Sequence, residues 1–142
     1  MTVREIRPQR AAYRAALLFG FAIAAAGCAY ALVNRGKVND AKADQVEQGI
    51  QALYLDVSTN LFYFTGIRLR PSERLHGAVI PANGDIVYLS PAFEEPKTRE
   101  LIHFGSDIRC WEEHEDPTAL VIDTLRSLGC DSGAVAGVHP LQ

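Results

Sequence analysis

The stretch that decides the fold is Leu53 to Pro81, which reads LYLDVSTNLFYFTGIRLRPSERLHGAVIP. It opens with the apolar run from Leu53 to Val57, which contains only one charged residue, Asp56, and is too short for a helix. The run ends at polar residues whose side chains compete for backbone hydrogen bonds, namely Ser58, Thr59 and Asn60. This pattern predicts a strand that runs out to a functional edge.

An aromatic cluster and a charged loop follow this strand. Leu61 to Phe64 are four large side chains in a row, and these cannot all face one core. Thr65-Gly66 then breaks the segment. The next loop is stiffened by Pro71 and rich in charged side chains, namely Arg68, Arg70, Glu73 and Arg74. A polar loop of this kind on a rigid scaffold is typical of recognition sites.

Composition and charge limit the class of protein. The 142 residues are 48% hydrophobic and 22% charged, with a formal net charge of -3, which fits one globular domain. Because there is no basic surplus, nucleic acid is not expected as a partner. Cys28, Cys110 and Cys130 are an odd number with no close pair. Their spacing predicts neither a disulfide framework nor a Cys-x-x-Cys site.

The N-terminus differs from the rest of the chain. Nineteen residues without a charge, Ala15 to Val33, follow four arginines and come close to the minimum length that spans a bilayer. The arginine excess predicts a cytoplasmic N-terminus and an exported or membrane-anchored domain. A cleaved signal peptide is an open alternative, because small residues from Ala24 to Gly27 precede Cys28. A buried alanine-rich helix in a cytoplasmic protein is another.

Helix and strand signals flank the central stretch on both sides. Asn34 to Lys37 is expected to be a polar linker, and Asn39 to cap a helix that ends at Gly49. Asn83-Gly84 predicts a tight type I′ hairpin. Cap-and-proline pairs and glycine stops predict the later elements, which are helix Pro91 to Phe104, strand Ile108 to Trp111, helix Pro117 to Leu128 and strand Ala134 to Val138.

This order predicts an α/β fold in which helices flank a mixed β-sheet, after one hydrophobic N-terminal helix. We place the N-terminal segment at residues 1–36 and the globular domain at residues 37–142. Metal-capable side chains cluster from Cys110 to His114, but a Cys-x-x-x-His without a second pair lacks the ligand count of a zinc site. No base is placed to activate Ser72 as a nucleophile, so no catalytic residue is assigned.

The central stretch resembles the N-terminal domain of the creatinase, prolidase and aminopeptidase P family of metallopeptidases. That family has a strand, a Ser-x-x-Asn-like turn, a Tyr-Leu-Thr-Gly-Phe box and a hairpin in this order. The matching residues here are Ala52 to Leu55, then Ser58 and Asn60, then Tyr63 to Ile67, and then Ala78 to Leu89. The resemblance covers roughly residues 38–136 and does not include the first 37.

The resemblance implies a non-catalytic role for this chain. Family members carry two divalent metal ions, such as Mn²⁺, in a separate C-terminal domain, and none of those ligands maps onto this sequence. The chain alone is therefore expected to lack that domain, to hold no metal and to be inactive. In the family this half mediates dimer contacts and lends residues to the rim of a neighbouring active site. The positions that would do so are Asn60, Tyr63, Arg70, Arg74 and His76.

Two functions remain open from the sequence. In the first, the chain is the N-terminal part of an Xaa-Pro peptidase, forms a homodimer and helps to bind a proline-containing peptide. In the second, it is a self-standing interaction module, tethered to a membrane through residues 15–33, without a peptidase partner domain.

Overall fold

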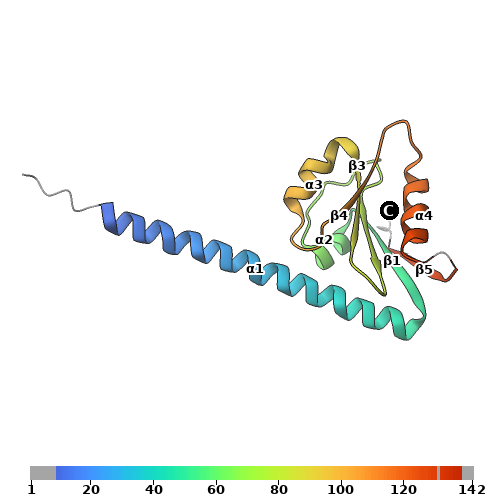
Figure 1. Ribbon diagram of the computed structural model, residues 1–142, viewed down its shortest axis with the longest axis horizontal. Helices are drawn as coiled ribbons and strands as arrows, with labels where there is room; N and C mark the ends of the chain where they lie inside the picture. Colours follow the sequence, from blue (N-terminus) through green and yellow to red (C-terminus); the bar gives the residue numbers. More distant parts are fainter. Residues whose placement is uncertain (1–8, 131, 139–142) are drawn as a thin grey trace, which may run out of the picture.

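A computed structural model describes residues 9–130 and 132–138, with side chains from Gly27 onward. A long N-terminal helix leads into an α/β domain (Figure 1). The elements in chain order are α1 (Gln9–Gln48), β1 (Ile50–Asp56), α2 (Thr59–Thr65), β2 (Gly77–Pro81), β3 (Val87–Pro91), the 3₁₀ turn η1 (Ala92–Glu94), α3 (Glu95–Leu101), β4 (Asp107–Trp111), α4 (Pro117–Ser127) and β5 (Ala134–Val138).

The five strands form one mixed sheet, in the order β4-β3-β2-β1-β5. β2 is antiparallel to both of its neighbours, whereas β1 pairs in parallel with β5 and β3 with β4. The C-terminal ends of β1, β3, β4 and β5 therefore share one end of the sheet with the start of β2. We call this end the carboxyl edge. The predicted α/β class and mixed sheet are confirmed.

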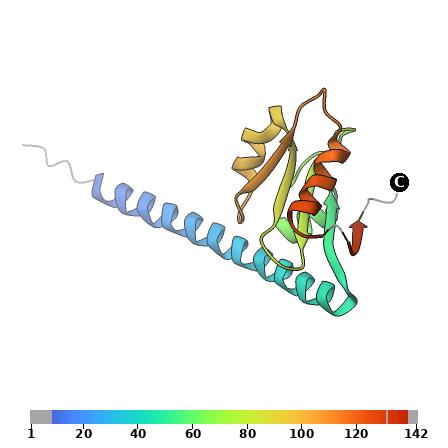
Figure 2. The same cartoon turned by 45° about the vertical axis from the view of Figure 1, so that its right-hand side comes forward.

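Two apolar cores lie on opposite faces of the sheet, because successive side chains of a strand point to opposite faces. On one face, Leu55, Ile80 and Tyr88 pack with residues of α1 and α2, including Val38 and Leu61. The core on the other face consists of Ala52, Val79, Val87, Leu89 and Cys130, with partly buried residues of α4 packed against it. The sheet thus lies between α1 and α2 on one side and α4 on the other (Figure 2).

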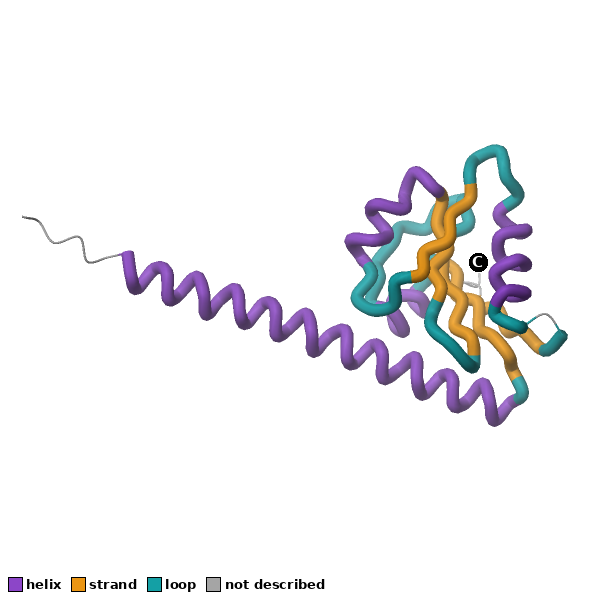
Figure 3. The backbone as a smooth tube through the Cα atoms, viewed as in Figure 1, coloured by secondary structure: helices purple, strands orange, loops and turns teal. Residues whose placement is uncertain are grey.

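Helix α1 is continuous through the region where the sequence predicts a linker (Figure 3). The linker from Asn34 to Lys37 and the cap at Asn39 were wrong, because all of these residues are helical. Tertiary packing explains why the helix continues here, because Asn34 and Val38 are buried against the domain, with exposed fractions of 1% and 3%. The predicted stop is confirmed, as the helix ends before Gly49, which has a φ of 69°.

Within the described residues, no helix is long and apolar enough to cross a membrane. The predicted membrane segment, Ala15 to Val33, lies mostly before Gly27, where the description of side chains begins. That segment therefore stays a prediction.

The short helix α2 was not predicted, although both of its ends carry signals. The Ser58 side chain accepts hydrogen bonds from the backbone N–H groups of Asn60 and Leu61, which caps the N-terminus. At the other end Gly66 has a φ of 75°. A β-carbon there would lie 2.6 Å from Cε1 of Tyr30, so glycine is required both by its backbone conformation and by the close approach of α1.

The type I′ hairpin predicted at Asn83-Gly84 was wrong. Pairing between β2 and β3 stops at Val79 and Val87, so the connection is longer than a type I′ hairpin. Only glycines among the described residues have positive φ, and Asn83 is therefore not in the conformation that such a turn needs. β2 instead continues to Pro81 by pairing with β1.

The helix predicted from Pro91 to Phe104 is shorter than expected. β3 extends to Pro91, which pairs with Trp111, and α3 begins only at Glu95, after η1 and with Pro96 in its first turn. The predicted start of α4 is confirmed, because the Asp116 side chain accepts a hydrogen bond from the Thr118 N–H and Pro117 follows it.

Candidate functional site

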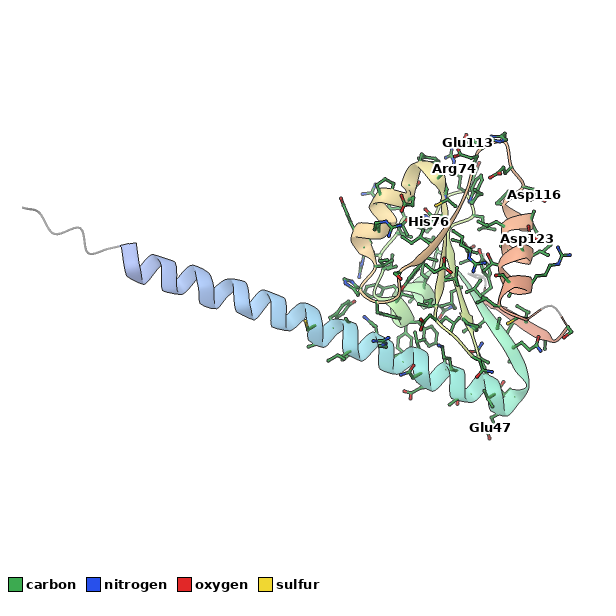
Figure 4. The ribbon with its side chains drawn as sticks, viewed as in Figure 1. Glu47, Arg74, His76, Glu113, Asp116 and Asp123 are labelled. Carbon is green, nitrogen blue, oxygen red and sulfur yellow. The ribbon has the colours of Figure 1, made fainter. Side chains whose placement is uncertain are left out.

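The residues that the sequence singles out lie at or near the carboxyl edge. Asn60 and Tyr63 are on α2, Arg70 and Arg74 are in the loop between α2 and β2, and His76 directly precedes β2. Figure 4 places Arg74 and Glu113 together at this end of the sheet, with His76 deeper in the domain. Each of these side chains has a different environment, and the environment decides what it can do.

A groove lies between the end of β1, α2 and the first part of the following loop. Its cavity volume is about 620 Å³, within the range that small-molecule and peptide side-chain sites occupy. Most of its lining is apolar, and the lining residues are Val57, Ser58, Thr59, Phe62, Ile67, Arg68, Leu69 and Pro71. The guanidinium carbon of Arg68 lies 4.5 Å from the centre of the Phe62 ring, which places one cation at the wall of the groove.

Arg70 does not itself line this groove, but in the chain it lies between two residues that do, Leu69 and Pro71. It is exposed, and no described residue pairs with its guanidinium. A free guanidinium can bind a carboxylate through two parallel hydrogen bonds. Arg70 is therefore the rim candidate that is available to bind an anionic group from outside the domain.

Arg74 is already paired within the chain. Its guanidinium lies 2.8 Å from Oε1 of Glu113 and 5.2 Å from the centre of the Phe93 ring. Both partners of the ion pair are about half exposed, so the pair contributes little to stability. Arg74 joins the loop before β2 to the loop after β4, and Phe93 remains 58% exposed beside it.

His76 is buried, with an exposed fraction of 5%. Its Nε2 lies 2.9 Å from Oγ1 of Thr98, and its Nδ1 lies 3.5 Å from Oε2 of Glu94. Burial lowers the pKa of His76, while the charge of Glu94 opposes that shift in part. A side chain held in this way positions the start of α3 against β2 and does not face a ligand directly.

Sequence reasoning missed most of the residues that hold His76. The Thr98 hydroxyl donates to the Glu94 carbonyl and lies 3.0 Å from Oγ of Ser90. Trp111 donates its indole N–H to the Leu75 carbonyl, one residue before His76. Apart from Glu94 and Thr98, which are four residues apart at helical spacing, no spacing pattern links these residues, because they meet only through the order of the strands.

Tyr63 and Asn60 contact other parts of the chain. The Tyr63 ring is 53% exposed, and Nζ of Lys37 lies 4.2 Å from its centre. Lys37 also donates a hydrogen bond to the Tyr63 carbonyl. Asn60 lies in the first turn of α2, where its backbone N–H donates to Ser58.

No group of three or more His, Cys, Asp or Glu side chains among the described residues could hold a metal ion. The sequence from Cys110 to His114 crosses the end of β4 into a loop, and His114 is exposed there. The pKa of the Cys110 thiol is raised, first by burial and then by the charge of Glu95, so this thiol is poorly suited to act as a nucleophile or a metal ligand.

Comparison with known proteins places this fold in a family. The family model of the creatinase/prolidase N-terminal domain matches residues 37–141. The chain belongs to that family. The resemblance seen in the central stretch of sequence is therefore confirmed, and the match begins within α1.

Solved structures of this family have the same fold. Dipeptidase PepE from Mycobacterium ulcerans is 26% identical with a TM-score of 0.69, covering 79% of this chain and 30% of that one. A dipeptidase from Pyrococcus horikoshii is 25% identical with a TM-score of 0.63, covering 74% and 28%. The N-terminal domain of an Xaa-Pro dipeptidase from Lactobacillus brevis, at 22% identity and a TM-score of 0.66, shares the fold.

Among curated proteins, an uncharacterized peptidase of Staphylococcus epidermidis is 31% identical over 64 residues, which are 45% of this chain and 18% of that protein. The match therefore spans less than a fifth of the length of its curated relative. The creatinase/prolidase N-terminal domain is one part of those longer chains.

Proposed function

We propose that this chain is the non-catalytic N-terminal domain of an Xaa-Pro metallopeptidase-like protein. In this proposal two copies form a homodimer, and the carboxyl edge of each domain shapes the rim of its partner's active site. Divalent metal ions such as Mn²⁺ would belong to a catalytic part and not to this domain.

The observation that carries the proposal is the combination of Arg70 with the groove beside it. The groove offers apolar walls of Val57, Ile67 and Leu69, which suit the ring of a proline side chain. Arg70 offers a guanidinium that no described residue has paired, which suits a peptide carboxylate. A short proline-containing peptide has both of these features.

The other rim candidates have supporting roles in this proposal. Arg74 and Glu113 connect the loop that carries Arg70 to the loop after β4, and the buried His76 holds the end of that loop against α3. Tyr63 and Asn60 belong to the helix that forms one wall of the groove. The rim therefore depends on one binding residue and several positioning residues.

Steady-state kinetics on a hybrid dipeptidase tests the proposal. In the hybrid, this chain replaces the matched part of the Mycobacterium ulcerans dipeptidase, and the substrate is an Xaa-Pro dipeptide. We expect Arg70→Ala to lower kcat/KM about 10- to 100-fold, mainly by raising KM, because a hydrogen-bonded contact to a charged group is worth roughly 1.5 to 3 kcal/mol.

Arg126→Ala is the matched control, because Arg126 is an exposed arginine on α4 that pairs with Asp123. Its kcat/KM should equal that of the unchanged hybrid. If Arg70→Ala and Arg126→Ala have the same kcat/KM, Arg70 does not bind the substrate. That result would favour the second function, a self-standing interaction module.

A further inference from the structure

A second candidate functional surface lies where α1 leaves the domain. Three large side chains on this part of α1 are exposed, namely Tyr30 at 41%, Leu32 at 68% and Val33 at 58%. No charged residue occurs from Ala15 to Val33, whereas Arg35 and Lys37 follow immediately. From Asn34 onward, α1 instead packs against the domain.

We infer that α1 enters a lipid bilayer and holds the domain in one fixed orientation, with the surface around Tyr30, Lys37, Tyr63 and His103 against the lipid headgroups. The partner is a bilayer surface, which these residues recognise through aromatic rings and basic side chains. The inference does not depend on the proposed peptidase role. It rests on the continuity of α1, on the depth at which the domain begins and on the chemistry of the residues there.

The connection between helix and domain is rigid because α1 has no break at residues 34–37. Gln45 is buried and donates its side-chain N–H to the Ile80 carbonyl over 3.0 Å. Lys37 donates to the Tyr63 carbonyl over 3.1 Å, and the Tyr30 and His103 rings meet edge to face at 5.3 Å. These contacts fasten α1 to the β2 strand, to α2 and to the segment after α3.

The lengths agree with a single span. The uncharged stretch of nineteen residues is about 28 Å long at about 1.5 Å per helical residue, close to the roughly 30 Å thickness of the hydrocarbon core. Lys37 follows Val33 by four residues, which is about 6 Å along the axis and falls at headgroup depth. The first contacts of the domain with α1, at Tyr30 and Asn34, therefore lie within about one helical turn of the end of the hydrocarbon core.

The residues at this level have the chemistry of a membrane interface. Tyr and Trp gather at the boundary between hydrocarbon and water, and Lys and Arg attract lipid phosphates. Tyr63 is half exposed with Lys37 over its ring, and Arg35, two residues before Lys37 on α1, is exposed. In this orientation the four arginines before the stretch remain on the opposite, cytoplasmic side of the bilayer.

In this orientation, α3 and the β2–β3 connection lie at different distances from the bilayer. Figures 1 and 2 both show α3 on the side of the domain that faces the N-terminal half of α1. Glu100 lies on α3, close before His103, and is exposed. Asn83 is exposed in the β2–β3 connection, beside the C-terminal end of α1, where Lys42 donates to the Gly84 carbonyl. The orientation places Glu100 near the headgroups and Asn83 far from them.

Fluorescence quenching in liposomes tests this orientation with the full chain. A nitrobenzoxadiazole label is attached at Glu100→Cys or at Asn83→Cys, in a chain carrying Cys28→Ser and Cys110→Ser and retaining the buried Cys130. The liposomes contain phosphatidylcholine and phosphatidylglycerol, with a nitroxide on the lipid headgroup as the quencher. We expect several-fold stronger quenching at residue 100 than at residue 83.

A flexible insertion provides the control. Six Gly and Ser residues between Val33 and Asn34 interrupt α1 and release the contact of Tyr30 with His103, while the domain keeps its contacts with residues 34–48. The insertion should leave liposome binding intact and lower quenching at residue 100 to the level at residue 83.

Three results would overturn the inference. One is equal quenching at the two positions in the chain without the insertion, and another is quenching at residue 100 that the insertion does not change. The third is a chain that stays off the liposomes, as it would if α1 paired with a second copy in solution. None of these results would alter the kinetics of the hybrid dipeptidase, so the two proposals fail separately.

Discussion

At the scale of single residues, burial separates His76 from the arginines beside it. His76 stands in the same charged loop sequence as Arg70 and Arg74 but is 5% exposed. It contacts Thr98 on α3 and Glu94 in the η1 turn. Its role is therefore to hold α3 and the loop in place, and that role depends on its protonation state.

The pKa of His76 predicts how the stability of the domain changes with pH. Burial lowers this pKa in the folded chain, whereas an unfolded chain takes up the proton at about pH 6.5. Between those two pKa values the unfolded state binds more protons, so the free energy of unfolding falls as pH falls through this window. We expect His76→Gln to lose less stability than the unchanged chain between pH 7 and pH 5 in urea unfolding.

His114→Gln is the control for this measurement, because His114 is exposed. Its loss of stability on acidification should match that of the unchanged chain. A His76→Gln profile that also matches the unchanged chain would show that His76 does not titrate differently in the folded state.

The roles of Arg70 and Arg74 could not be distinguished from the sequence. Both lie in one polar loop and both are exposed. The partner of Arg74 is Glu113, which is 39 residues away and meets Arg74 only because β3 and β4 bring the two loops to one edge. A contact that depends on strand order leaves no local pattern, so the sequence predicted the loop but not which of the two arginines has an ion-pair partner among the described residues.

At the scale of elements, α2 shows how one short helix divides four large side chains. Leu61 is 1% exposed and belongs to the core under the sheet, whereas Tyr63 on the same helix is 53% exposed. The rule that four consecutive large residues cannot share one core is confirmed, and the helix is what separates them.

This division predicts different costs for two substitutions in α2. Leu61→Ala should lower the free energy of unfolding by about 2 to 5 kcal/mol, because it leaves a cavity in the core. Tyr63→Ala should cost about 1 kcal/mol or less, because its ring is already half in solvent and surface changes usually have small effects. Chemical denaturation of both variants measures the difference, and equal costs would show that Tyr63 is buried by a partner.

Elements with periodic patterns were predicted well, and elements fixed by tertiary contacts were not. β1, β4, α4 and β5 follow from apolar runs and cap signals that act locally. The continuity of α1 at Gly36 and Asn39 instead depends on the packing of Asn34 and Val38 against the domain. α2 likewise needs Gly66 to approach Tyr30 closely, and no sequence window contains both residues.

At the scale of the whole molecule, the chain combines a helix that projects from the domain with a carboxyl edge that carries a groove and an arginine that no described residue pairs (Figure 1). The two features meet at α2, which forms one wall of the groove and carries Tyr63 beside Lys37 of α1, and they support separate proposals. In the two proposals, the helix anchors the domain in a bilayer and the carboxyl edge faces a partner subunit.

The most direct test of the central claim asks whether Arg70 acts on a neighbouring subunit. Two hybrid dipeptidase subunits with different affinity tags are co-expressed, and dimers carrying both tags are purified. One subunit has Arg70→Ala with an intact catalytic part, and the other has native Arg70 with an inactivated catalytic part.

If Arg70 completes the active site of its partner, the mixed dimer should recover the kcat/KM, per intact catalytic part, of the hybrid with native Arg70 on both subunits. The Xaa-Pro dipeptide assay of the mixed dimer gives this value. A mixed dimer no more active than the Arg70→Ala hybrid would contradict the claim that this domain shapes a partner's active site.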